Sequence, residues 1–64
     1  MITDRERGDT VLDSITNGQY KQAKSQLQSM TREQRFNVCL YIDELGYTDK
    51  AWTCIRWCIE VNFK

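Results

Sequence analysis

Three cysteines are the residues of this chain best suited to specific chemistry. Cys54 and Cys58 are four residues apart, so a helix would place both thiols on one face, and Cys39 could approach them from a neighbouring helix. A structural zinc site usually has four ligands, often Cys-x-x-Cys pairs with histidine. The chain has no histidine and only three cysteines. We therefore expect no metal and no cofactor, and we interpret the thiols as small hydrophobic core residues.

Side chains arranged for catalysis are also missing from the sequence. There is no histidine to act as a general base, no Gly-x-Ser-x-Gly nucleophile motif and no glycine-rich phosphate loop. Asp43 and Glu44 are adjacent, so on a helix they would diverge rather than flank a substrate. Acidic residues here are expected to be solvated helix surface. The sequence predicts that the protein is not an enzyme.

The last stretch of the chain is the most apolar and is predicted to be a helix over residues 49–62. Its polar residues fall on one stripe, and the remaining apolar arc covers roughly 240° of a helical wheel. A surface helix needs an apolar arc of only about 100° or a little more. This helix must therefore be covered from more than one direction.

Two tryptophans divide this helix into two faces. Trp52 and Trp57 are five residues apart and point about 140° from each other. The face predicted to enter the core, against Val38, Ile42 and Leu45, consists of Trp52, Ile55, Ile59 and Phe63. The other face either packs under the first two helices or meets another chain. We predict the second arrangement, a homodimer whose interface includes Trp57, Val61, Cys54, Phe36 and Leu40.

Apolar residues at three- and four-residue spacing predict helices in the rest of the chain. The expected ranges are residues 4–16, 19–29, 31–45 and 49–62. Thr3 with Glu6, and Thr31 with Gln34, fit capping boxes, although the first helix could instead begin near residue 10. The sequence thus predicts a single domain over residues 1–64. Its fold class is all-α: a small bundle of three to four short helices arranged as two helical hairpins.

Gly18 and Gly46 stand where the first and third helices should end, because glycine readily adopts the left-handed conformation of a helix C-cap. Residues 18–23, with the sequence GQYKQA, resemble the second-helix half of a tetratricopeptide repeat. In that family the Gly-x-Tyr-x-x-Ala run lets two antiparallel helices pack closely around the alanine. A solenoid needs at least three repeats, so the resemblance implies helical hairpins rather than a peptide-binding groove.

Residues 45–48, with the sequence LGYT, resemble the turn of a helix-turn-helix motif. This resemblance implies that the last helix enters the major groove of DNA. The candidate DNA-binding residues are Thr48, Lys50, Thr53 and Arg56. Basic side chains nearby are few, and DNA affinity depends largely on phosphate neutralisation by lysine and arginine. A DNA-binding regulator is therefore the alternative function, and nucleic acid is not the favoured partner.

Charge and hydropathy restrict the partners and the compartment. Nine basic and nine acidic residues give a formal net charge of zero, which provides no general attraction to nucleic acid or anionic lipid. The sequence contains no run of about 18 apolar residues, so no transmembrane helix is predicted. The charged N-terminus lacks the apolar stretch of a signal peptide. We expect a cytoplasmic protein without a membrane partner, and reduced thiols.

As a whole, this short helical chain with its cysteines, tryptophans and charged N-terminus is similar to small accessory proteins of lambdoid temperate phages. Those proteins are encoded in the early region between exonuclease and excisionase. The resemblance implies a non-enzymatic protein of the host cytoplasm that influences host regulation or the lysis–lysogeny balance. The predicted function is protein–protein interaction, as a homodimer and with an unidentified host protein.

Overall fold

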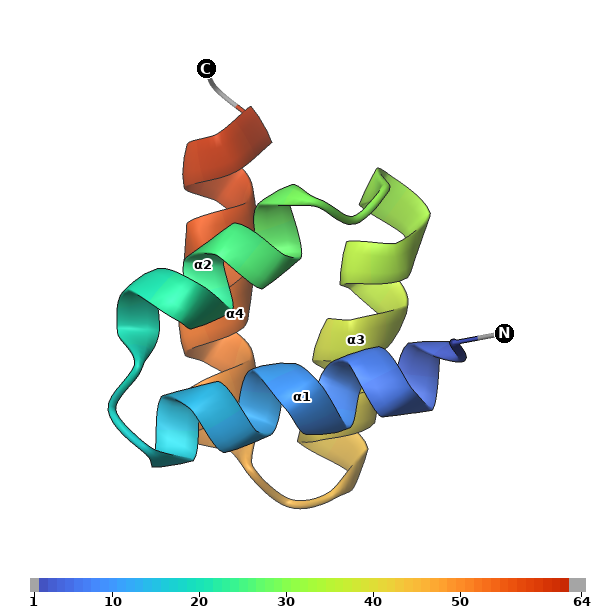
Figure 1. The fold of residues 1–64 in the computed structure, drawn as a ribbon. Helices are drawn as coiled ribbons and strands as arrows, with labels where there is room; N and C mark the ends of the chain where they lie inside the picture. The colour runs from blue at the N-terminus through green and yellow to red at the C-terminus, as the bar shows by residue number, and fades with distance from the viewer. Residues whose placement is uncertain (1, 63–64) are drawn as a thin grey trace.

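Two helical hairpins, one lying across the other, make up the fold (Figure 1). The computed structural model describes the backbone of residues 2–62 and the side chains of residues 2–60. Its helices are α1 (Asp4–Thr16), α2 (Tyr20–Gln28), α3 (Arg32–Glu44) and α4 (Thr48–Asn62). The α1–α2 hairpin crosses the α3–α4 hairpin, so that α1 packs on α3 and α2 packs on α4. The predicted all-α bundle is confirmed.

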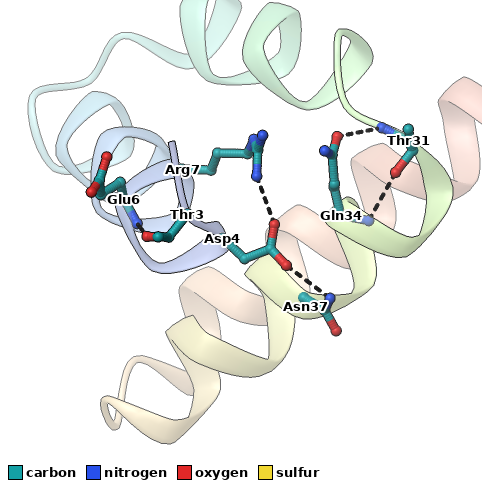
Figure 2. Close-up of polar contacts among 7 residues, drawn as sticks. All are labelled: Thr3, Asp4, Glu6, Arg7, Thr31, Gln34 and Asn37. Carbon is teal, nitrogen blue, oxygen red and sulfur yellow. Dashed lines mark hydrogen bonds and ion pairs between the residues drawn. The ribbon is translucent and has the colours of Figure 1, made fainter. Parts of the chain in front are cut away.

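Threonine caps begin both α1 and α3 (Figure 2). The hydroxyl of Thr3 accepts a hydrogen bond from the backbone N–H of Glu6 at 3.2 Å. A complete capping box begins α3: the N–H of Thr31 donates to Oε1 of Gln34 at 2.9 Å, and the N–H of Gln34 donates to Oγ1 of Thr31 at 3.2 Å. These bonds satisfy N–H groups that have no partner within a helix. They also place the start of α1 at residue 4 rather than near residue 10.

Glycines in the left-handed conformation end α1 and α3. The φ angles of Gly18 and Gly46 are +76° and +93°. After α3, the N–H of Tyr47 donates to the carbonyl of Ile42 at 3.3 Å, and the equivalent bond closes α1. A backbone bond across five residues, closing around a left-handed glycine, is characteristic of the Schellman motif. This motif satisfies carbonyl groups at the end of a helix.

Asp4 ties the beginning of α1 to the middle of α3 (Figure 2). Its Oδ1 accepts a hydrogen bond from Nη1 of Arg7 at 2.8 Å, and its Oδ2 accepts one from Nδ2 of Asn37 at 2.9 Å. Asp4 therefore both supports the first turn of its own helix and holds that turn against a second helix.

A close approach joins α1 to α3 further along. Gly8 is buried against the ring of Tyr41, and a Cβ at position 8 would overlap that ring. The hydroxyl of Tyr41 donates to Oδ1 of Asp9 at 2.8 Å, and this bond is the main reason that the pKa of Tyr41 is raised. Gly8 is the one glycine inside a helix, and no sequence pattern predicts this role for it.

The hydrophobic core lies between the two hairpins. Its buried members are Val11, Ile15, Ala23, Leu27, Met30, Val38, Cys39, Ile42, Ala51, Cys54 and Trp57. Each helix contributes residues to this set, so displacing any one helix would expose core side chains to solvent. None of the helices within residues 2–62 combines the length and the apolar character needed to cross a bilayer.

The inward face of α4 is the opposite of the one predicted. Trp57 is 8% exposed, whereas Trp52 is 63% exposed. The prediction that Trp52, Ile59 and Leu45 belong to the core is wrong, because all three are exposed. Ile55 is half-buried. The predicted core residue Phe63 lies outside the described residues.

Side-chain size explains this orientation. The distance between packed helices depends on the residues at their contact, and α4 turns Ala51 and Cys54 inward, where α2 contributes Ala23. Small residues let the helices approach, and Trp57 then fills the space beside them. Its indole meets the ring of Tyr20 edge-on. Of the two arrangements left open by the sequence, packing under the first two helices is the one observed for this face.

Candidate functional site

An apolar groove runs between α3 and α4, and no residue of α1 or α2 lines it. We call it the α3/α4 groove. Its volume is about 360 Å³. Four large exposed side chains form its rim: Phe36 and Leu40 from α3, and Trp52 and Ile59 from α4. The buried Cys39 and the half-buried Ile55 and Cys58 form its floor.

Opposite charges line the two ends of the groove. Arg32 and Arg35 lie at the end formed by the start of α3, and Asp43 lies near the end of that helix. The rise of an α-helix separates Arg32 from Asp43 by roughly 16 Å. Nη1 of Arg35 also donates to the carbonyl of Met30 at 2.9 Å, which holds its guanidinium in place after α2. The groove therefore has a positive end and a negative end.

Two thiols meet on the groove floor. A hydrogen bond from the Cys39 thiol lowers the pKa of Cys58 to about 7, with burial acting in the opposite direction and the charge of Arg35 in the same direction. The pKa of Cys39 is raised, first by this hydrogen bond and then by burial. Burial, with the nearby Cys58, raises the pKa of Cys54 to about 12. Of these free thiols, Cys58 alone is both incompletely buried and ionisable near neutral pH.

The predicted interface residues are divided between surface and core. Phe36 and Leu40 are exposed on the groove rim. Cys54 and Trp57 are buried within the chain, which corrects the expectation that they form a surface. The side chain of Val61 lies outside the described residues. The expected apolar surface therefore exists, but it lies on the other side of α4.

Trp52 and Ile59 line the groove, although the sequence predicted that both would lie in the core. Both faces of α4 are apolar, so hydrophobicity alone does not distinguish them. A size pattern does: Ala51 and Cys54 mark a face of small side chains on which another helix can approach closely. Bulky residues on the opposite face then have no helix of this chain to cover them.

The candidate DNA-binding residues do not gather on one face. At 100° per residue, Thr48, Lys50, Thr53 and Arg56 spread over roughly 200° of the circumference of α4. Nζ of Lys50 lies 5.0 Å from the centroid of the Tyr47 ring, while Arg56 is exposed elsewhere on the helix. A helix reading DNA needs its contacting side chains on one side, and this set does not meet that condition.

Among the side chains of residues 2–60, no group of three or more histidine, cysteine, aspartate or glutamate residues is arranged to hold a metal ion.

No protein family, curated protein or solved structure matches this chain.

Proposed function

We propose that the protein is a non-enzymatic binding protein that associates with a second copy of itself through the α3/α4 groove. The observation that carries this proposal is the set of large apolar side chains exposed on one surface: Phe36, Leu40, Trp52 and Ile59. Burying one such side chain completely is worth about 1.5–3 kcal/mol. Aromatic residues near the centre of an interface commonly supply most of its binding energy.

The charges at the two ends of the groove favour a second copy as the occupant. A two-fold axis perpendicular to the groove brings the same surface of both chains together with the two grooves running in opposite directions. The Arg32 end of one groove then meets the Asp43 end of the other, twice in each dimer. A partner carrying only one sign of charge would be attracted at one end and repelled at the other.

The size of the domain supports the same occupant. A chain of about 60 residues buries only about 60% of the surface that its unfolded form exposes. Association through the groove adds apolar burial that the single chain lacks. We extend the proposal to a regulatory role in a host cytoplasm, which is what the resemblance expected from the sequence alone, to accessory proteins of lambdoid phages, would imply.

A matched pair of leucines tests the interface. Leu40 is 44% exposed on the groove rim, and Leu45 is 46% exposed but does not line the groove. Leu40→Lys should convert a dimer to a monomer, because it places a charge in the apolar contact. Leu45→Lys adds the same charge at the C-cap of the same helix and should leave the dimer intact. Sedimentation velocity over a range of concentrations measures both.

Two results would overturn the proposal. A parent protein that stays monomeric at high micromolar concentration does not associate with itself in any useful range. Equal effects of Leu40→Lys and Leu45→Lys would show that the dimer, where it forms, uses a different surface. Circular dichroism of both variants establishes that neither effect comes from unfolding.

A further inference from the structure

The thiol pair on the groove floor has chemistry that self-association does not use. Cys39 comes from α3 and Cys58 from α4, and both line the same groove of about 360 Å³. A cavity of this size accepts a small molecule. The rim around the two thiols is apolar. Arg35 lines the same groove as Cys39 and Cys58.

The two thiols differ in access and in surroundings. Cys39 is buried, whereas Cys58 is only half-buried and opens into the groove. The Cys39 thiol and the positive charge of Arg35 both lower the pKa of Cys58, to about 7, so the thiolate of Cys58 is stabilised. A thiolate that is accessible and electrostatically supported is the nucleophilic form of cysteine.

We propose that the α3/α4 groove is a thiol-exchange site, in which Cys58 forms a mixed disulfide with a small disulfide whose apolar part lies in the groove. The Cys58 thiolate, its proton already lost to solvent, attacks one sulfur of that disulfide. The new S–S bond forms as the old one breaks, and the second sulfur leaves as a thiolate with the bonding electron pair. Cys58 is oxidised, and the departing half of the ligand is reduced.

Cys39 acts as a positioning residue in this exchange. Its thiol lines the same groove and contributes to the lowered pKa of Cys58, and its own buried position keeps it from competing for the ligand. Cys54 is four residues before Cys58 but is fully buried in the core. The structure thus separates one reactive thiol from two protected ones.

A group attached to Cys58 would occupy the volume that the second chain enters. Exchange is therefore expected to dissociate the dimer, and reduction of the mixed disulfide to restore it. This consequence rests on the proposed self-association, whereas the exchange reaction itself does not.

The experiment uses 2,2′-dithiodipyridine, a small aromatic disulfide, on the dilute intact protein. Mass spectrometry of peptides identifies the modified cysteine, and released thiol gives the rate. One equivalent should react at Cys58, on the order of tenfold or more faster than at the buried thiols, with a rate that rises through pH about 7. Cys58→Ser should lose the fast reaction, and Cys54→Ala, the matched control, should keep it.

Cys39→Ala should keep the adduct on Cys58 but move the midpoint of the rate–pH profile to higher pH, a shift that a merely structural role would not cause. Circular dichroism confirms that each variant is folded. Equal labelling of all three cysteines, labelling first at Cys39, or an unmoved midpoint in Cys39→Ala would overturn the proposal. Labelling at Cys58 in a protein that is always monomeric would support exchange and refute self-association; a dimer that dilution separates but that stays unlabelled at Cys58 would do the reverse.

Discussion

The Trp57 indole stands edge-on to the Tyr20 ring, with centroids 6.2 Å apart and ring planes inclined at 65°. This arrangement matches the attraction between the positive edge of one ring and the negative face of another. Nζ of Lys24 lies 5.7 Å from the same indole and 3.6 Å from a carboxylate oxygen of Glu60. One turn of α2 therefore covers the tryptophan that α4 turns inward.

Truncating the two tryptophans should give unequal losses of stability. Trp57→Ala removes a buried aromatic side chain and should lower the free energy of unfolding by about 3–5 kcal/mol. Trp52→Ala removes an exposed one and should cost less than about 1 kcal/mol in the monomer. Urea denaturation at low protein concentration measures both. Equal losses would contradict the orientation of α4.

Gly8→Ala should destabilise the protein although alanine is the better helix former. The substitution gains about 1 kcal/mol in helix propensity, but the new methyl group must displace the Tyr41 ring, and strain of this kind costs about 1–3 kcal/mol. In a Tyr41→Ala background the strain is gone, so the same substitution should stabilise by about 1 kcal/mol. A cycle of four urea denaturations gives the coupling. Independent effects of the two substitutions would show that Gly8 is not selected by this contact.

Reversing the charges at the ends of the groove should first weaken and then restore the dimer. Arg32→Glu places like charges at both end contacts and should weaken association about tenfold. The double variant Arg32→Glu/Asp43→Arg restores opposite charges across the two-fold axis. Because these positions are roughly 16 Å apart on one helix, beyond the Debye length of about 8 Å at physiological salt, rescue within one chain is not expected. Analytical ultracentrifugation of the two variants decides whether rescue occurs.

Stability should rise between neutral and mildly alkaline pH and then fall. The pKa of Cys58 is lowered from its ordinary value of 9.0 to about 7 in the folded protein, so between these values the unfolded chain keeps a proton that the folded chain has lost. Under that condition the free energy of unfolding increases with pH. Above about pH 9 the raised pKa of Cys54, about 12, reverses the slope, because the folded state now retains the proton.

Urea midpoints measured with a phosphine reductant test this profile. Cys58→Ser should lose the rise between pH 7 and 9 and keep the later fall. A rise of the same size in the serine variant would show that another group produces it.

The sequence allowed the helices and their ends to be predicted well, because the signals that set them are local. The capping pair Thr31 and Gln34 and the stop signals at Gly18 and Gly46 each act within one turn. The apolar stripe of the third helix likewise identified Val38 and Ile42 as core residues. These features need no knowledge of how the hairpins cross.

The orientation of α4 and the role of Gly8 required that knowledge. Both sides of α4 are apolar, so the choice between Trp52 and Trp57 depends on where α2 lies. Position 8 requires glycine only because the ring of Tyr41, on another helix, lies where a Cβ would be. The site was predicted in part for the same reason: Phe36 and Leu40 were recognised as surface residues, while the α4 half of the groove was assigned to the core.

The two helix-ending glycines make the chain sensitive to chirality at two points. With φ of +76° at position 18 and +93° at position 46, an L-residue is strained, although an L-Cβ would meet no atom within 4 Å at either place. The strain is thus a matter of handedness alone, and D-alanine, whose backbone favours positive φ, would remove it. Chemical synthesis with D-alanine at either position should raise the free energy of unfolding by about 0.4–1 kcal/mol by restricting the unfolded chain, and L-alanine should lower it. Mirror-image residues therefore fit this protein better than natural ones at the two places where its helices stop.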